Sequence, residues 1–384
     1  MEKNRISFRL RSDIIIQLGL LKNFAKEVEA FSLKRPLLIW DQNLKNTEYF
    51  ETIKSKLLNF SSNGVFMPLK LTGEPSYELL SELLEGLDMS SFDSVVSLGG
   101  GSIMDIGKGL ALLASNPCEP KTLKGFPTGL NDPLPHITIP SVLGSGAEAS
   151  FNAVFIDEAE GKKLGINSIN NFPTMVLVDP LLTMSAPKPV VISSALDCMV
   201  HCVDSFGSLK SSPISKMFSV EAFRNVWTFI SERDLDDAKS RLLLAQASIL
   251  GIYGLMNSGD GPTNGFAYYF GVKKKIAHGM AGGMFLCDVM KWNYDNGYMS
   301  YNHLISDTST SDMDEFFNIF SQRLEEFSIP TLLDYGFKSK DCENLSSDVS
   351  SALTGSFSGN PIPFNKDSAY WVLSQQFKNN LQDN

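Results

Sequence analysis

The first 180 residues alternate between short apolar runs and longer segments with helical spacing. Residues 36–40 are a continuous apolar run closed by Asp41, and residues 94–98 are a further predicted strand that leads into three glycines. Further strands are expected at residues 7–10, 65–69 and 136–139, with helices at residues 18–30, 48–58, 76–87 and 103–114. Apolar runs of this kind are typical of strands buried on both faces, so the alternation predicts a parallel sheet covered by helices on both sides.

From about Asp179 the strand patterns become scarce and helical spacing dominates, with a boundary near residues 178–187. Helices are expected at residues 187–207, 218–230, 238–257, 282–292, 314–327 and 367–381. The chain has 384 residues, which is more than one hydrophobic core usually serves, so two domains are expected. We therefore predict an α/β domain over residues 1–182 and an all-helical domain over residues 183–384.

Composition and charge narrow the classes of partner. The net charge of −10 argues against nucleic acid and anionic membranes, because both would repel an acidic protein. The first 11 residues lack the apolar core of a signal peptide, and no stretch reaches the roughly 18 uninterrupted apolar residues of a membrane span. Five cysteines at irregular spacing suggest no disulfide framework and fit a reducing compartment, so we predict a cytoplasmic protein.

The three glycines stand at a predicted strand-to-helix junction, as Gly99, Gly100 and Gly101, followed by Ser102. Glycine lets the backbone approach a ligand closely or adopt a positive φ. The helix behind the turn would direct unpaired N–H groups and the positive end of its dipole at a pyrophosphate, and the Ser102 hydroxyl could add a donor. The pattern is neither G-x-G-x-x-G nor a P-loop, and a tight turn without a ligand is the alternative; the strand–turn–helix context favours the ligand.

Two further features fit a dinucleotide. Asp41 follows the first apolar strand, where a carboxylate can accept hydrogen bonds from ribose hydroxyls and repel a 2′-phosphate, which favours NAD over NADP. An ordinary strand-end aspartate is the alternative. The small, polar stretch at residues 138–148 supplies Ser141 and Ser145 as possible donors to the cofactor, although loops of this composition are common.

The histidines raise the question of a metal. Asp197 and His201 are spaced i and i+4, so on a helix they share one face, and His278 precedes Gly279. Two imidazoles and one carboxylate could bind a divalent metal and leave open positions for a substrate oxygen. That metal would polarise a carbonyl or stabilise an alkoxide. On spacing alone, a hydrogen-bonded structural pair is the alternative.

Together these segments resemble the iron-containing (group III) alcohol dehydrogenases, which share a fold with dehydroquinate synthase. The family pattern G-G-G-S-x-x-D-x-x-K is matched in full by residues 99–108. The other matched elements are the small-residue segment at 140–148, the D-P-x-L-T element at 179–183, the ligand helix at 197–201 and the H-G pair at 278–279. Their order and spacing agree from about residue 36 to residue 293.

The resemblance implies an N-terminal dinucleotide-binding domain, a C-terminal metal and substrate domain, and an active site in the cleft between them. It implies hydride transfer between an alcohol and an aldehyde or ketone, NAD more than NADP, iron or zinc, and a homodimer or larger assembly. By analogy with some relatives, the substrate would be a polyol or sugar-derived. The implied cofactor contacts are Asp41, Gly100, Gly101, Ser102, Asp105, Ser141, Ser145, Asn152 and Lys163.

Two positions depart from the family pattern. Asn264 stands fourteen residues before His278, where the family has a third ligand histidine, and Tyr268 replaces a catalytic-type histidine. An amide oxygen is a poorer ligand than imidazole, so Asp197, His201 and His278 would hold the metal with Asn264 or water completing the site. We predict that His278 and Tyr268 act in catalysis. The Tyr268 hydroxyl could hydrogen-bond the substrate oxygen or relay a proton.

Several alternatives stay open. Tyr268 could instead belong to a packed aromatic run with Tyr269 and Phe270. Asn264 and Tyr268 together suggest a metal-independent reductase of the same fold. A lyase or cyclase of the dehydroquinate synthase type would use NAD transiently without net redox change, and a non-catalytic protein would bind NAD without turnover.

Overall fold

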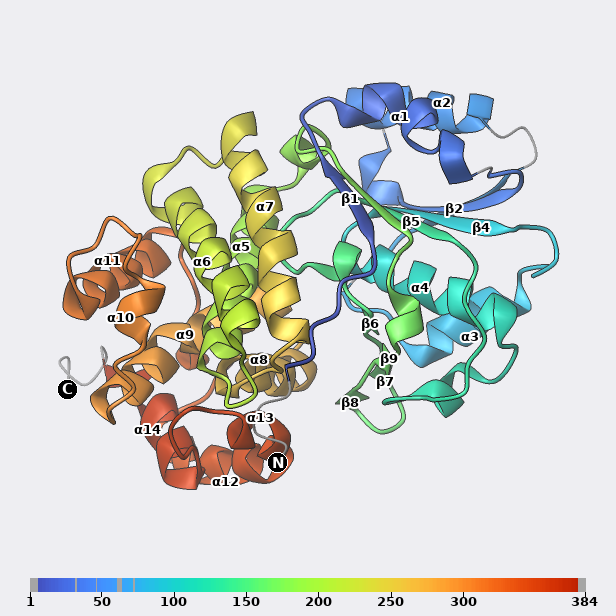
Figure 1. Ribbon diagram of the computed structural model, residues 1–384. Coiled ribbons are helices and arrows are strands. Elements are labelled where there is room, and N and C mark those ends of the chain that lie inside the picture. The colour runs from blue at the N-terminus through green and yellow to red at the C-terminus, as the bar shows by residue number, and fades with distance from the viewer. Residues whose placement is uncertain (1–5, 32, 46, 61–63, 72, 379–384) are drawn as a thin grey trace. The chain divides into compact units, whose positions relative to one another are not determined.

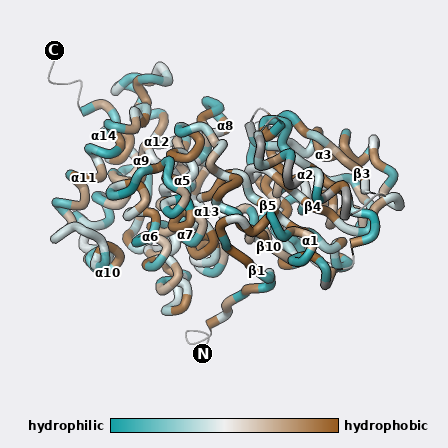
Figure 2. Tube along the Cα trace, turned by 90° about the horizontal axis from the view of Figure 1, so that it is seen from above, coloured by the Kyte–Doolittle hydropathy of each residue, from teal (hydrophilic) through white to brown (hydrophobic). Residues whose placement is uncertain are grey.

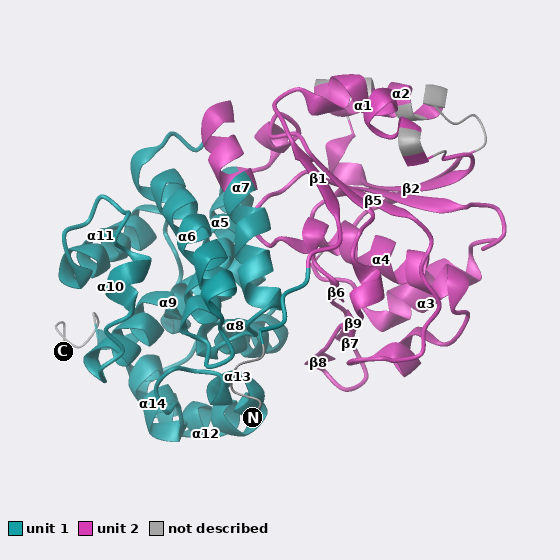
Figure 3. Ribbon diagram, in the orientation of Figure 1, with its two compact units in different colours: residues 1–9, 188–235, 246–384 teal, residues 10–187, 236–245 magenta. Residues whose placement is uncertain are grey.

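The computed structural model describes residues 6–378, apart from positions 32, 46, 61–63 and 72. It divides into two compact units (Figure 3). The α/β unit comprises residues 10–187 and 236–245, and the helical unit comprises residues 1–9, 188–235 and 246–384. The predicted fold class is confirmed. The main division follows Pro187, five residues beyond the boundary predicted after residue 182, and the exact domain limits remain a prediction.

Six parallel strands form the sheet of the α/β unit, in the order β1-β10-β5-β4-β2-β3. The strands are β1 (Asp13–Ile16), β2 (Pro36–Asp41), β3 (Val65–Leu69), β4 (Ser94–Gly99), β5 (His136–Pro140) and β10 (Met175–Val178). In register, Leu38 of β2 lies opposite Val96 of β4, which lies opposite Ile137 of β5. The sequence predicted β2 to β5, whereas the short runs that form β1 and β10 were missed.

Helices cover both faces of this sheet (Figure 1). Helices α1 (Phe24–Glu27) and α2 (Glu48–Phe60) lie on one face, and α3 (Tyr77–Glu85) and α4 (Gly101–Ser115) lie on the other. Successive residues of β2 point to opposite faces, as the strand period requires. Trp40 therefore stacks on Phe50 of α2, while Ile39 joins the core with Leu80 of α3. Figure 2 shows the hydrophobic character of β1, β5 and β10.

Two predictions near the N-terminus are wrong. Residues 7–10 form no strand; the backbone N–H of Arg9 donates to the Asn257 side chain, and the Phe8 ring stacks on Phe218, so this segment is bound by helices instead of a sheet. The helix expected over residues 18–30 is broken into the 3₁₀ helix η1 (Leu20–Asn23), α1 and the 3₁₀ helix η2 (Glu29–Phe31).

The Asp179 carboxylate stabilises the turn between β1 and η1. This carboxylate is fully buried after β10 and accepts the N–H groups of Gly19, at 2.9 Å, and Leu21, at 3.0 Å. Gly19 adopts a left-handed φ of 76°, which an aspartate-capped turn before η1 requires and which glycine allows without cost. The Tyr49 hydroxyl also donates to Asp179. The D-P-x-L-T element therefore has a structural role in the sheet.

Four short strands between β5 and β10 form two antiparallel pairs that the sequence did not predict. They are β6 (Asn152–Ala153) with β9 (Ile166–Asn167), and β7 (Ile156–Asp157) with β8 (Lys162–Lys163). Their two-residue length gives no measurable alternation, so period-based reasoning could not detect them.

The helical unit is built around α5 (Lys188–Gly207), which packs against α6 and α9. The other helices are α6 (Pro213–Glu232), α7 (Ala238–Met256), α8 (Pro262–Lys274), α9 (His278–Asp295), α10 (Tyr301–Leu304), α11 (Met313–Glu326), α12 (Cys342–Ala352), α13 (Thr354–Ser358) and α14 (Lys366–Gln375). The first part of α7, up to residue 245, belongs to the α/β unit. In the described part of the chain, α5 alone is long and apolar enough to cross a membrane, yet 89% of its apolar window is buried, as in a core helix.

The sequence predicted α5, α6, α7 and α11 closely but missed α8, α10, α12 and α13. Helix α9 begins at His278, four residues before the predicted start at residue 282. Helix α14 ends at Gln375; positions 379–381 of the predicted C-terminal helix lie outside the described residues. Phe266 and Phe270 of α8 stack on Phe285 of α9 in the core of this unit.

His136 gives the α/β unit a sensitivity to acid. Its Nε2 lies 2.8 Å from the Ser97 hydroxyl, and burial, together with the nearby Lys108 charge, lowers the pKa of this imidazole to about 3. An unfolded histidine has a pKa near 6.5, so between these values the unfolded chain binds the proton that the folded chain excludes. The stabilisation is therefore complete above about pH 6.5 and is lost as the pH falls.

When the pH is lowered from about 7.5 to about 5.5, we expect His136 to lower the free energy of unfolding of the wild-type protein by about 1 kcal/mol. His136→Gln, which keeps a hydrogen-bonding nitrogen near Ser97, should lose less over this range. Melting temperatures at the two pH values measure the difference. His303→Gln, at an exposed histidine, is the matched control and should keep the wild-type pH dependence. Equal pH dependence in His136→Gln and wild type would contradict the prediction.

Candidate functional site

The carboxyl ends of three neighbouring strands bring the predicted cofactor residues together. Asp41 ends β2, Gly99 ends β4 and Ser141 follows β5. From β2 the chain continues to β3 on one side, and from β4 to β5 on the other, so the winding of the sheet reverses between β2 and β4. Open parallel sheets bind ligands in the crevice at such a reversal.

The N-terminus of α4 opens at this crevice. Gly100 is the N-cap residue, has no side chain to cap the helix, and accepts the N–H groups of Ile103 and Met104 on its carbonyl. The N–H groups of Gly101 and Ser102 therefore have no partner within the helix. A diphosphate suits these donors and the positive end of the helix dipole, so this feature fits the predicted nucleotide.

Close packing, not a positive φ, explains the glycine at the strand end. A Cβ atom at Gly99 would lie 2.6 Å from Cγ1 of Ile103, which is too close for any other residue. None of the three turn glycines has a positive φ, so that part of the expectation is wrong. At Gly100 the nearest atom to such a Cβ would be Cγ2 of Val142 at 3.8 Å, an ordinary van der Waals contact, so packing alone does not require glycine there.

Ser141 and Ser145 lie beside the glycine turn. The Ser141 N–H donates to the Gly99 carbonyl at 2.8 Å. A Cβ at Gly101 would lie 3.3 Å from the Ser145 hydroxyl oxygen, so the two positions are neighbours. Asp41 is half-buried and accepts the N–H of Asn43. The structure therefore groups Asp41, Gly100 to Ser102, Ser141 and Ser145.

The remaining predicted cofactor residues have partners within the protein. The Ser102 hydroxyl donates to the Gly73 carbonyl at 3.1 Å, and Lys163 forms an ion pair with Glu74 of the same loop. The Asn152 amide donates to Asn167 at 3.0 Å. The sequence gave no signal for residues 73–74, because an isolated Gly-Glu pair in a loop has no distinctive pattern.

Asp105 lies inside the protein. Its carboxylate pairs with Lys108 at 3.1 Å, and burial raises the pKa of Asp105 while the lysine charge opposes that rise. Lys108 also donates to the Asn152 carbonyl at 2.6 Å and to the Ser150 hydroxyl at 2.9 Å. This buried pair holds the segment around residues 150–152 against α4, a function that the motif alone did not reveal.

The predicted metal and catalytic residues form a chain of contacts in the helical unit. On α5, His201 Nε2 lies 3.4 Å from Asp197 Oδ1. The same oxygen lies 3.7 Å from Nε2 of His278, the first residue of α9. His278 Nε2 lies 2.8 Å from Oδ1 of Asn264, in the first turn of α8. Asp197, His201 and Asn264 are buried, whereas His278 keeps 17% side-chain exposure.

The Asn264 contact favours the forms of His278 that carry a proton on Nε2. An amide oxygen can only accept, so the Nε2 atom of His278 carries the proton in this hydrogen bond. The Tyr268 ring packs against the His278 imidazole, with 4.8 Å between ring centroids. Tyr269 instead packs edge-on against Phe270, which is buried in the core. The aromatic run is thus divided, with Tyr268 at the histidine and its neighbours elsewhere.

The donor set fits a divalent metal in chemistry but not in the present arrangement. Ligands held at about 2.1 Å around one tetrahedral ion lie about 3.4 Å apart, which is close to the separations of Asp197 from the two imidazoles. Among the described residues, however, no three His, Cys, Asp or Glu side chains form a group that could hold a metal ion. Binding through His278 Nε2 would require this atom to give up its proton and its bond to Asn264.

A second buried carboxylate, which the sequence did not single out, lies beside this cluster. Asp204 is on α5, three residues after His201, and its Oδ2 accepts the backbone N–H of Asn264 at 2.8 Å and that of Gly261 at 3.1 Å. Burial raises the pKa of Asp204 to about 7, with a contribution from the Asp260 charge. Only the three-dimensional arrangement reveals it, because residues 204 and 264 are distant in sequence.

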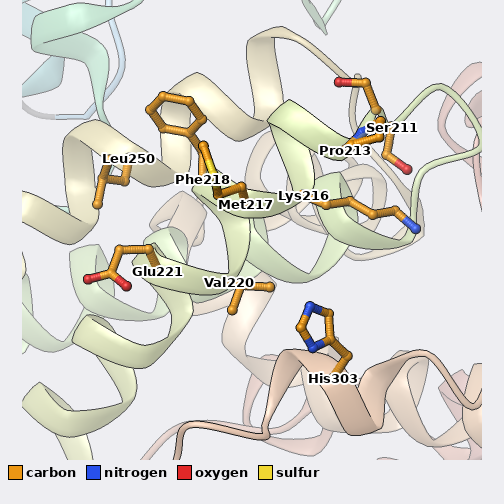
Figure 4. Close-up of a pocket in the computed structure, with 10 residues that line it drawn as sticks. Ser211, Pro213, Lys216, Met217, Phe218, Val220, Glu221, Leu250 and His303 are labelled. Carbon is orange, nitrogen blue, oxygen red and sulfur yellow. The ribbon is translucent and has the colours of Figure 1, made fainter.

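A cavity of about 790 Å³ opens elsewhere on the helical unit (Figure 4). Lys216, Met217 and Glu221 of α6 line it together with Leu250 of α7 and His303 of α10. None of the residues predicted for cofactor, metal or catalysis lines this cavity. The candidate chemistry and this hollow are therefore separate features of the unit.

Comparison with known proteins identifies the family of this chain. Residues 12–180 match the family described as iron-containing alcohol dehydrogenase, and residues 191–377 match its C-terminal family. Alcohol dehydrogenase 4 of Schizosaccharomyces pombe is 26% identical over 350 residues, covering 88% of this chain and 82% of that protein. The NAD-dependent methanol dehydrogenase of Bacillus methanolicus is 22% identical over 86% of this chain and 90% of its own length.

The solved structure of a 1,3-propanediol oxidoreductase has the same fold, with a TM-score of 0.88, 19% identity, and coverage of 97% of this chain and all of that one. The chain therefore belongs to the iron-containing alcohol dehydrogenase family. It is an oxidoreductase that interconverts alcohols and carbonyl compounds with a nicotinamide dinucleotide, in a family that uses NAD(H) and a divalent metal.

The start of α9 depends on glycine. A Cβ atom at Gly279 would lie 1.9 Å from the Ser193 carbonyl oxygen of α5, so Gly279→Ala must push α9 away and displace His278. We expect a loss of about 1–3 kcal/mol in stability and at least about tenfold in kcat/KM. Thermal melts and steady-state kinetics measure both. Gly355→Ala in α13, where the added methyl meets open space, should leave both unchanged, and equal effects of the two variants would contradict this account.

Proposed function

We propose that this protein is an NAD-preferring dehydrogenase or reductase whose substrate is a polyol or a sugar-derived alcohol or carbonyl. The grouping of Asp41, the glycine turn, Ser141 and Ser145 at one edge of the sheet carries the nucleotide part of this proposal. The Asp41 carboxylate would accept ribose hydroxyls and repel the extra phosphate of NADP. Ser102, Asp105, Asn152 and Lys163 would complete or support the cofactor site.

The substrate class rests on the altered positions Asn264 and Tyr268. Tyr268 presents a phenol in place of an imidazole, whereas the buried Asn264 amide contacts His278 and acts through it, so the groups for substrate hydroxyls are the phenol and the His278 imidazole, which both form hydrogen bonds with them. A hydroxylated carbon chain would use these groups better than a simple short alcohol would. The protein would act in the cytoplasm, as a homodimer or larger homo-oligomer, on a small molecule and not on nucleic acid or a membrane.

The protein's own residues would handle the proton. Bound NAD(H) supplies or accepts the hydride at the carbinol carbon. During carbonyl reduction, the proton that His278 carries on Nε2 would pass to the developing alkoxide, and alcohol oxidation would return it. Tyr268, packed on His278, would hydrogen-bond the substrate oxygen or relay this proton. Asp197, adjacent to both imidazoles, would stabilise a positive charge on either one.

A divalent metal, iron or zinc, would be held by Asp197, His201 and His278, with Asn264 as a doubtful fourth ligand, and would polarise the substrate oxygen. The hydrogen bond between Asn264 and His278 favours the alternative of a metal-independent reductase of the same fold, because it occupies the nitrogen that a metal needs. A lyase or cyclase that uses NAD transiently would show no net change in the nicotinamide.

The absorbance of the reduced nicotinamide tests the activity directly. We expect turnover with NADH above NADPH, and with hydroxylated aldehydes or ketones above short ones, in metal-loaded or chelated protein. His278→Ala should lower kcat by about 10²–10⁴ while calorimetry still detects NAD(H) binding. The proposal fails if neither turnover nor binding of NAD(H) or NADP(H) is found, and binding without turnover by wild type would indicate a non-catalytic protein.

The variant Asn264→His tests whether a divalent metal binds beside position 264. Restoring an imidazole should raise affinity for iron or zinc at least about tenfold, because imidazole is a better ligand than an amide for these ions. Elemental analysis and titration against a competing chelator measure it, with Asn264→Ala as the control that should gain no affinity. Equal metal binding by wild type and Asn264→His would show that position 264 does not face the metal.

A further inference from the structure

Helix α8 is capped by a residue from another helix. Its N-cap residue is Gly261, which has no side chain, and Pro262 occupies the first helical position. Helices usually satisfy their first N–H groups with a serine, threonine, aspartate or asparagine at the N-cap position. Here the Asp204 carboxylate of α5 performs that function across the interior of the helical unit.

The geometry reproduces both halves of a capping box. In that motif the N-cap side chain accepts the N–H of the third helical residue, and the side chain of that third residue accepts the N–H of the N-cap. Asp204 Oδ2 accepts from both backbone groups, 2.8 Å from the Asn264 nitrogen and 3.1 Å from the Gly261 nitrogen. Asn264 is that third residue, so its side chain is not needed to cap the helix.

The side-chain amide of Asn264, which does not cap the helix, contacts His278 instead. Its Oδ1 accepts the Nε2 proton of His278 at 2.8 Å. Asn264 is 2% exposed, so its amide is out of contact with bulk solvent and needs a partner in the interior. The carboxylate that holds the Asn264 backbone therefore also fixes the point in space from which the amide reaches His278.

The close approach of α5 and α8 depends on the same contact. A Cβ atom at Gly261 would lie 2.8 Å from Cγ of Asp204, so only glycine admits the carboxylate at this distance. Asp204 lies seven residues after Asp197, on the same face of α5. Helix α5 thus places Asp197 beside the His278 imidazole. It also places Asp204 at the backbone of Asn264, the residue whose side chain contacts His278.

We propose that Asp204 is a positioning residue for the reaction: by capping α8 from α5, it places the Asn264 amide against His278. This inference rests on the proposed function only for its kinetic consequence, because the hydrogen bond on His278 can be observed in protein without metal, nucleotide or substrate.

Nitrogen-15 NMR of the histidine side chains gives the direct readout. The sequence has four histidines, so the spectrum is simple, and His278→Ala identifies the His278 signals. In wild type we expect a protected, hydrogen-bonded proton on His278 Nε2. Asp204→Ala and Asn264→Ala should both lose it, whereas Asp204→Asn, which keeps an acceptor oxygen, should retain it.

Asp288→Ala is the matched control. Asp288 is a half-buried carboxyl group in the same unit, desolvation raises its pKa likewise to about 7, and it accepts a hydrogen bond from Gln376 at 2.8 Å. This variant should lose stability without changing the His278 signal or kcat. Loss of the His278 proton in Asp288→Ala would mean that the signal reports general destabilisation, and it would overturn the inference.

Kinetics then tests whether Asp204 acts through Asn264. Asp204→Ala should lower kcat about 10- to 100-fold with little change in KM, and Asp204→Asn should restore most of it. In the Asn264→Ala background the same Asp204→Ala change should cost less than about twofold, because the group it positions is absent. If the kcat losses of Asp204→Ala and Asn264→Ala instead multiply in the double variant, the two residues act independently and the inference is overturned.

If Asp204→Ala does not fold, Gly261→Ala perturbs the same contact from the other side, since its methyl group would displace the carboxylate. It should also remove the protected proton on His278. A folded Gly261→Ala protein that retains this proton contradicts the inference. Absence of turnover in wild type, with the NMR results as expected, would count against the proposed function alone.

Discussion

The burial of α5 is the constraint on which the candidate chemistry depends. Fifteen of its twenty residues are buried, including Asp197, His201 and Asp204. A helix surrounded by protein cannot leave ionisable side chains to water, and burying them without partners would cost several kcal/mol each. The neighbouring helices supply those partners: His278 at the start of α9 and the first turn of α8 both meet α5 at these residues. The polar cluster is therefore the means by which three helices pack, as well as a place for chemistry.

The two units build their sites by different means. In the α/β unit, the parallel strands end at one edge of the sheet. The residues that follow β2, β4 and β5 therefore lie close together, however far apart they are in sequence. Helix packing brings no fixed set of residues together in this way in the helical unit. Its polar cluster depends on two close approaches, of the Asp204 carboxylate to Gly261 and of the Ser193 carbonyl oxygen to Gly279. The family match extends over both units. The departure at Asn264 belongs to the second, where the amide oxygen lies 2.8 Å from Nε2 of His278.

Much of the fold could be read from patterns along the chain. Long segments with helical spacing, such as α5 and α11, and apolar runs, such as β2 and β4, were located within a few residues. The failures have physical causes. Helix α8 carries Pro262, Asn264 and Gly265, which favour turns by themselves, and its helix is stabilised by Asp204 and by packing of Phe266 and Phe270. Residues 7–10 alternate like a strand, but the Asn257 side chain and Phe218 take the contacts that a sheet would provide.

By itself the sequence determined the α/β and helical halves, the glycine turn on a helix N-terminus, and the i, i+4 pairing of Asp197 with His201, because each depends on residues close together in the chain. Only the tertiary structure decided that the Asn264 amide oxygen meets Nε2 of His278, that Tyr268 and not Tyr269 packs on that imidazole, and that Asp204 caps a helix some sixty residues away. Such contacts join distant segments, and their distances follow from how buried helices fit together, which local spacing does not encode.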